Sequence, residues 1–332
     1  MSSTIKRNKY EIDMCNGTIM DKLISFSLPL MLSGILQLMF NAVDIIVIGR
    51  FSGSQSLAAV GSTTALINMF TNLFIGISLG ANVLSARFYA AGKDKEMSET
   101  VHTAITLALI SGIIMVFVGL IFAKPVLELM DTPDDVINLS TLYMRIYFMG
   151  MPFFMLYNYG ASILRAVGDT KRPLFYLIVA GIANAGLNMC LVIIFHLGVA
   201  GVAIGTVISQ LISSILVLRC LYQSETSYQL RFSKLKIQKE YLKQIFQVGI
   251  PAGIQSTVIN FSNVLLQSSV NSFGSIAMAG YTAANNIFGF LYVTVNAVTQ
   301  ACMSFTSQNY GVGKWKRMDR VLIDCLILSF VA

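Results

Sequence analysis

The sequence predicts an all-α, polytopic membrane protein with two lobes of six transmembrane helices each, the second lobe being incomplete within these 332 residues. Three observations predict this fold: the composition, the series of long apolar segments, and an internal repeat. Only 12% of the residues are charged and 55% are hydrophobic, whereas a soluble domain has about 25% charged residues. The mean hydropathy is +0.70. This composition excludes both a soluble domain and a disordered chain.

The apolar segments predict eight complete spans and part of a ninth, since about 20 apolar residues cross a bilayer as a helix. Single spans are expected at 23–43, 51–86, 100–123 and 146–164, two within 173–218, two within 244–313, and the start of another at 321. Because the last segment stops inside a hydrophobic run, we expect the chain to be a fragment of a longer protein.

The basic residues indicate how the chain is oriented. If the N-terminus is cytoplasmic, 20 of the 23 Lys and Arg residues fall on cytoplasmic segments, as the positive-inside rule requires. We therefore expect a multi-pass protein of the plasma membrane, surrounded by lipid, with a cytoplasmic N-terminus. The net charge of +7 then reflects this topology. Nucleic-acid binding is not expected, because the basic residues are dispersed over five segments.

An internal repeat divides the chain into lobes. Pro29 and Pro251 lie 222 residues apart, as do Phe51 and Phe273. The repeat unit therefore contains six spans, and an even number gives both copies the same orientation, as in transporters that rock two lobes around a central site. The expected divisions are a cytoplasmic N-terminus at 1–22, a first lobe at 23–220, a cytoplasmic loop at 221–243 and the start of a second lobe at 244–332.

One carboxylate falls inside the first predicted span. Burying a carboxylate in hydrocarbon is costly, so such a residue is a functional hypothesis by default. Gln37 and Asn41 precede Asp44 on the same helical face. We interpret Asp44 as a site of cation or proton coupling, supported by this polar stripe. The alternative is that Asp44 pairs with Arg50 near the outer surface.

Further polar residues inside the spans are expected to line the same cavity. They are Asn158, Asn184, Asn188 and Thr206 in the first lobe, and Gln255 and Asn260 in the second. Each alone is more typical of helix packing than of ligand binding. The repeat partner of Asp44 is Leu266, so the second lobe has no matching acid. The stretch 143–155 is dense in Met and aromatic residues. We expect most of them to face lipid or pack helices, and some to line a cavity for flat cationic or amphipathic compounds.

Enzyme, cofactor and metal chemistry are not predicted. The five cysteines are isolated from one another, so neither a metal site nor a redox motif is expected. The two histidines, His102 and His196, fall at opposite ends of their spans, about 30 Å apart across the hydrocarbon core. They cannot cooperate in catalysis, and no other catalytic constellation is present.

Five segments resemble the multidrug and toxic compound extrusion (MATE) transporters. They are residues 44–53 (DIIVIGRFSG), 57–61 (LAAVG), 165–173 (RAVGDTKRP), 198–203 (GVAGVA) and 249–255 (GIPAGIQ). The resemblance implies twelve spans in two lobes, of which this chain would lack most of spans 9 to 12. It also implies export of organic cations or other amphipathic compounds driven by H⁺ or Na⁺ influx, without a cofactor. Asp44 matches the coupling carboxylate of the family's first span.

Two positions depart from the family pattern. Many members carry Asn and Asp four residues apart on the fifth span, where this chain has Asn184 and Asn188. Some carry an acid on the seventh span, where Asn260 stands here. Asp44 is therefore the one clear coupling site in these 332 residues. The sequence does not determine whether the coupling ion is H⁺ or Na⁺.

The working expectation is a monomeric secondary antiporter for a small amphipathic substrate. A flippase for lipid-linked saccharides is the alternative with a related architecture. It would need basic residues in its cavity to bind a diphosphate, and Arg145 is the one basic residue deep within a predicted span. Efflux is therefore preferred.

Overall fold

The computed structural model describes residues 9–130, 132–271 and 275–331, apart from the side chains of Ala65 and of several residues between 260 and 287. These residues form helices and no strand, which confirms the all-α prediction. The helices are α1 (Met20–Phe51), α2 (Gly53–Ala90), α3 (Asp94–Leu129), α4 (Asp134–Met149), α5 (Met151–Ala166), α6 (Lys171–Met189), the π-helical turn η1 (Cys190–Ile194), α7 (Gly198–Tyr222), the 3₁₀ turn η2 (Phe232–Lys234), α8 (Lys239–Asn271), α9 (Ser275–Gly311) and α10 (Trp315–Val331).

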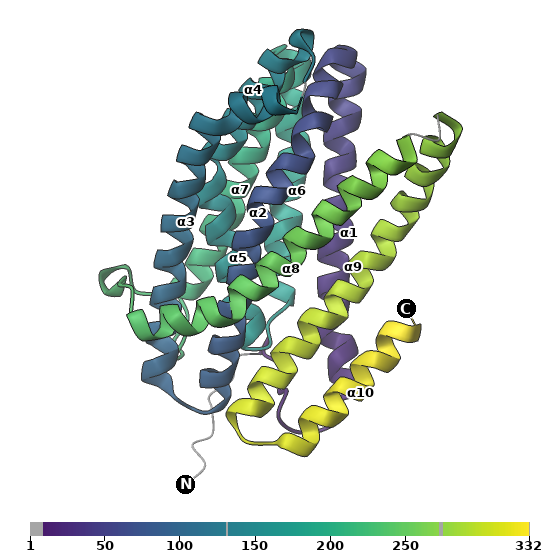
Figure 1. The fold of residues 1–332 in the computed structure, drawn as a ribbon. Helices are drawn as coiled ribbons and strands as arrows, with labels where there is room; N and C mark the ends of the chain where they lie inside the picture. Colours follow the sequence, from purple (N-terminus) through teal and green to yellow (C-terminus); the bar gives the residue numbers. More distant parts are fainter. Residues whose placement is uncertain (1–8, 131, 272–274, 332) are drawn as a thin grey trace.

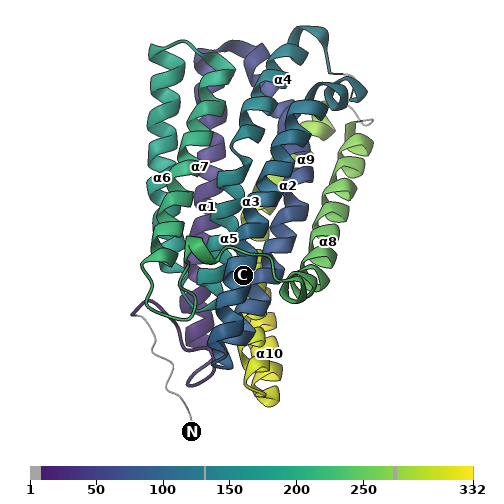
Figure 2. The same cartoon turned by 90° about the vertical axis from the view of Figure 1, so that its left-hand side faces the viewer.

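The long helices run roughly side by side along one axis (Figures 1 and 2). Helices α2 to α7 pack against one another, and α8 crosses the outer side of α2 on a diagonal (Figure 1). Helix α9 returns beside α1 and α2, and α10 packs on α9. The group α2–α7 is here called the first bundle. Helix α2 contacts both the other helices of this bundle and the pair α8–α9.

Six helices are long and apolar enough to cross a membrane within the part of the chain that the structure describes. They are α1, α2, α3, α6 with η1, α7 and the second part of α9. Helix α8 has 33 residues but carries polar residues such as Gln247 and Gln255 among its apolar ones. The two spans expected within 244–313 should be separated by a polar turn at Asn271–Ser275, and part of this turn lies outside the described residues.

The fourth predicted span differs from the structure. Residues 146–164 do not form one helix, because α4 ends at Met149 and α5 begins at Met151. Pro152 stands in the first turn of α5. Proline has no backbone N–H and its ring clashes with the preceding turn, so it is favoured in the first turn of a helix and disfavoured in the interior. The apolar pattern continues across this break, and so it could not reveal the two helices.

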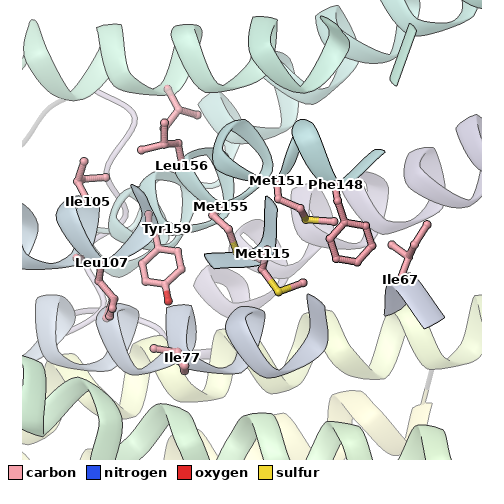
Figure 3. Packing of buried hydrophobic residues seen from close by; sticks show 14 of the residues in the cluster. Ile67, Ile77, Ile105, Leu107, Met115, Phe148, Met151, Met155, Leu156 and Tyr159 are labelled. Carbon is pink, nitrogen blue, oxygen red and sulfur yellow. The ribbon is translucent and has the colours of Figure 1, made fainter. Parts of the chain in front are cut away.

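The larger hydrophobic core lies inside the first bundle. Tyr159, Phe148, Met115 and Met155 are almost fully buried there, and Figure 3 shows them between facing helices. Close packing of aromatic and Met side chains fixes α3, α4 and α5 against α2. Two helices of this bundle, α6 and α7, carry part of the candidate site.

A second core joins the beginning of α1 to α9 and α10. Phe26 of α1 meets Phe305 of α9 edge to face, with 5.6 Å between ring centroids. Both rings are completely buried, together with Met14, which precedes α1. Helix α1 thus belongs to the first lobe in sequence but also packs on the second. The division into lobes at 220 and 243 stays a prediction.

Candidate functional site

Asp44 lies in the second half of α1, the first candidate membrane span. Its side chain is half-buried where α1 contacts α6. No ion pair joins Asp44 to Arg50, and Arg50 is exposed at the end of α1. Among the described residues the partner of the Asp44 carboxylate is an amide, not a cation. The alternative of a surface ion pair is therefore not supported.

A chain of hydrogen bonds connects this carboxylate to two further helices. Asn188 of α6 donates from Nδ2 to Asp44 Oδ1, and the same nitrogen lies 3.3 Å from Asn184 Oδ1. Asn184 Nδ2 donates in turn to Thr206 Oγ1 of α7 over 3.4 Å. The hydroxyl of Thr206 donates to the carbonyl of Val202 over 2.9 Å. Four residues of the predicted site thus form one polar group between α1, α6 and α7.

The local backbone makes room for this group. Gly205 of α7 faces Asn188, and a side chain at 205 would take the place of Asn188 Oδ1. Asn188 is completely buried, and its Oδ1 has no hydrogen-bond partner among the described residues. The π-helical turn η1 begins two residues later, at Cys190. Such turns often mark functional sites in helices.

Two tyrosines close to the site were missed as site residues. Tyr143 and Tyr147 of α4 lie 6.0 Å apart by ring centroids, and both lie within electrostatic reach of Asp44. Tyr143 is buried and Tyr147 half-buried, and Gln210 of α7 lies close to the Tyr147 hydroxyl. The one sequence signal was the Met- and aromatic-rich stretch 143–155 to which they belong. Gly205 had no signal in the sequence at all.

Other predicted residues are not joined to the hydrogen-bonded group. Asn158 donates to the carbonyl of Phe154 within α5, over 2.8 Å. Gln37 and Asn41 are exposed on α1 and make no hydrogen bond to a described residue, and Gln255 is exposed on α8. The side chain of Asn260 lies outside the described residues.

No group of three or more His, Cys, Asp or Glu residues with metal-binding geometry occurs in the part of the chain that the structure describes. The oxygens near Asp44 come from one carboxylate, two amides and one hydroxyl. Oxygens of these kinds can bind a proton or a monovalent cation.

Comparison with known proteins places the chain in a family. The MatE family profile matches residues 29–191 and 251–332. A protein named as a probable multidrug resistance protein, YoeA of Bacillus subtilis, is 32% identical over 315 residues, which cover 92% of this chain and 68% of the relative. The multidrug export protein MepA of Staphylococcus aureus is 23% identical over 308 residues, with the same coverage of both chains.

Solved structures agree with this fold. A multidrug resistance MATE family transporter in an outward-facing conformation superposes with a TM-score of 0.90 at 22% identity, over 98% of this chain and 72% of that chain. A MOP superfamily transporter from Pyrococcus furiosus gives the same values. Proteins of the matched family are transporters, so the enzyme alternative is set aside. The chain belongs to the MatE family of multi-pass membrane transporters.

Proposed function

We propose that this protein is a secondary antiporter that exports organic cations or other amphipathic compounds in exchange for H⁺ or Na⁺. The two lobes would alternate between opening toward the cytoplasm and opening outward. The protein would lie in the plasma membrane with its N-terminus in the cytoplasm. The names of its relatives, multidrug resistance and multidrug export proteins, support this substrate class over a lipid-linked saccharide.

The observation that carries the proposal is the environment of Asp44. A half-buried carboxylate in a membrane-spanning helix, with an amide and no cation as its partner, is a costly arrangement. A proton or Na⁺ that binds there removes the uncompensated charge. Binding therefore favours the conformation in which the site is most secluded, and this difference in affinity couples ion binding to movement of the lobes.

The amide of Asn188 is placed to respond to the ion. With its nitrogen toward Asp44 and Asn184 it donates to two oxygens, which suits an ionised carboxylate without a bound cation. If the Asn188 amide group flipped, its Oδ1 and Nδ2 would exchange positions, and Oδ1 would face Asp44 where Nδ2 does now. The oxygens of Asp44, Asn184 and Asn188 would then surround one point and could bind Na⁺. A proton on Asp44 would be accepted by the same Oδ1.

The substrate and the ion are tested together by efflux of ethidium from energised cells that express the whole gene. We expect faster efflux than from cells without the protein. Removing Na⁺ stops efflux if Na⁺ is the coupling ion, and collapsing the proton gradient at constant Na⁺ stops it if H⁺ is. No efflux of ethidium or of other organic cations would contradict the proposed substrate class. Efflux that is independent of both gradients would contradict antiport.

Asn188→Ala tests the supporting amide. The substitution removes the hydrogen bond to Asp44 and leaves a small cavity beside it, so we expect the efflux rate to fall about tenfold, the equivalent of about 1.4 kcal/mol. The matched control is Asn158→Ala, because Asn158 bonds to its own helix and not to Asp44. Equal losses in the two variants at matched expression would show that the amide at 188 has no special role.

A further inference from the structure

The chain before α1 crosses the end of the molecule where the basic residues gather. Residues 11–17, here called the strap, are not helical and lead into α1, which begins at Met20. The beginning of α1 and the turn between α9 and α10 lie together at this end (Figure 1). The sequence predicts only that this segment belongs to the cytoplasmic N-terminus at 1–22.

The first lobe holds one side of the strap. Ile12 N donates to Gly168 O over 3.2 Å, and a side chain at 168 would collide with the backbone of Ile12. Gly168 also has φ +99°, a conformation that glycine adopts without strain. This turn between α5 and α6 is therefore shaped to accept the strap.

Glu11 connects the strap to two more elements. Its carboxylate accepts from the hydroxyl of Tyr89 in α2 over 2.6 Å and from the hydroxyl of Tyr228 over 2.7 Å. Tyr228 belongs to the loop between α7 and α8 and is completely buried. Burial, with the nearby Glu11 carboxylate adding to it, raises the pKa of the Tyr228 phenol above its ordinary value. The phenol therefore remains a hydrogen-bond donor at neutral pH.

The second lobe holds the other side, chiefly through Arg317 of α10. Its guanidinium donates to three backbone carbonyls of the strap: from Nε to Met14 O over 3.2 Å, from Nη2 to Asn16 O over 3.1 Å and from Nη1 to Gly17 O over 2.9 Å. Charged donors make stronger hydrogen bonds than neutral ones, and the planar guanidinium fixes the geometry.

Two further side chains of the second lobe bind the strap. Lys314 Nζ lies 2.8 Å from Cys15 O and 2.8 Å from Asn16 Oδ1. Asn309 of α9 donates to Met14 O over 3.1 Å. Met14 itself is completely buried in the second core. Side chains from α9, α10 and their turn thus bind the strap.

The strap holds its shape through Asp13. The Asp13 carboxylate accepts from the backbone of Cys15 at 3.0 Å and of Asn16 at 3.2 Å, which forms a tight turn. Lys22 of α1 donates to the carbonyls of Asp13 and Asn16, over 2.8 and 2.6 Å. The strap is therefore an ordered element with defined carbonyl acceptors.

Beneath the strap, polar side chains join the lobes directly. Ser304 of α9 donates to Asn82 Oδ1 of α2 over 3.1 Å, and Arg165 Nη1 of α5 lies 2.8 Å from Gln300 Oε1 of α9. Further hydrogen bonds between 9–220 and 244–331 join Gln308 of α9 to Cys15 and to the carbonyl of Ala166. For the cavity to open at this end, these bonds must break.

We infer that the strap is a releasable clamp that holds the two lobes together at the N-terminal end of α1, and that it must leave α10 before the protein opens there. The inference rests on the proposed alternating access. It assigns Arg317 and Lys314 to holding the closed state, and it makes release of residues 14–17 from Arg317 a step in the transport cycle.

The test measures opening without relying on transport. In a variant whose native cysteines are replaced by Ser, Ser304→Cys provides a buried thiol under the strap; Ser304 is 1% exposed. A water-soluble maleimide is applied to the strap side in membrane vesicles. We expect Arg317→Ala to raise the labelling rate about tenfold, because the closed state loses three charged hydrogen bonds. Arg320→Ala is the matched control, since Arg320 lies on the same helix, is exposed and does not bind the strap. Equal labelling of all three proteins would overturn the inference, even if the protein exports nothing.

A crosslink provides a second arm in case Arg317→Ala does not fold. Cys15 Sγ lies 3.8 Å from Gln308 Oε1 of α9, so Gln308→Cys is expected to form a disulfide with Cys15 when the two thiols are oxidised by copper phenanthroline. The closed crosslink should stop transport, and reduction should restore it. Ser62→Cys with Ser140→Cys is the control within the first lobe, where the two hydroxyls are 3.2 Å apart, and transport should persist. Transport at the parental rate by the strap-crosslinked protein would contradict the clamp.

Discussion

Asp44→Asn is expected to reduce ethidium efflux to the level of cells without the protein, a loss of at least about tenfold. Asparagine has nearly the same shape, and its side-chain oxygen can still accept from Asn188, so the fold and expression should be unchanged. What the variant loses is the charge that a proton or Na⁺ neutralises. Without it the two conformations no longer differ in their affinity for the ion, and the gradient cannot drive export.

The control for this variant is Asp134→Asn. Asp134 is exposed at the beginning of α4, where the change removes one negative charge without touching the polar group between α1, α6 and α7. We expect its efflux to match the parent. Equal efflux from Asp44→Asn and the parent would remove Asp44 from the mechanism and direct attention to the second lobe.

Gly80→Ala is expected to be the most destabilising small substitution between the lobes. Helices α2 and α8 pack backbone to backbone where Gly80 meets Gly249, and where Gly76 meets Gly253. A methyl group at 80 would overlap the carbonyl oxygen of Ile245. Small residues allow helices in membranes to approach this closely. Because backbone atoms cannot turn aside as a side chain can, we expect a loss of about 3 kcal/mol of stability.

Thermal unfolding in detergent, followed by size-exclusion chromatography, measures this loss. Gly61→Ala is the matched control on the same helix, because a methyl group there would meet nothing within 4 Å. Replacing Gly by Ala in an open helical position stabilises by about 0.5–1 kcal/mol, so its melting temperature should stay equal or rise slightly. Equal melting temperatures for the two variants would contradict the close approach of α2 and α8.

The fold class followed from physical quantities that the sequence contains directly. Apolar length predicts spans because an uncharged helix of that length has few alternatives to lipid. The break between α4 and α5 was missed, since Gly150 and Pro152 interrupt the helix without interrupting the apolar pattern. The position of this break depends on the backbone properties of Gly150 and Pro152, which an apolar pattern does not describe.

For the candidate site, the sequence could predict which residues share a helix face, but not which helices pack together. Asp44 stood out because it is an acid among apolar residues, and Asn184 with Asn188 because they are four residues apart. That Asn188 meets Asp44 while Asn184 meets Thr206 depends on how α1, α6 and α7 pack. Asn158 has the same chemistry but is satisfied within its own helix.

The contacts of the strap could not be predicted from the sequence. Its contacts are mostly backbone carbonyls that receive donors from residues about 300 positions away. A backbone acceptor has no sequence signature, because every residue type offers one. Lys314 and Arg317 are among the 20 basic residues expected on cytoplasmic segments, and the sequence predicts nothing more about them.

The most direct measurement of the central claim is ion movement driven by substrate. The complete protein is reconstituted in liposomes, an outward gradient of ethidium is imposed, and uptake of ²²Na⁺ and of protons is followed, the latter with a trapped pH-sensitive dye. The account predicts that the parent takes up one of the two ions as ethidium leaves, and that Asp44→Asn takes up neither. Export by the parent without movement of either ion, or equal ion uptake by both proteins, would contradict coupling at Asp44.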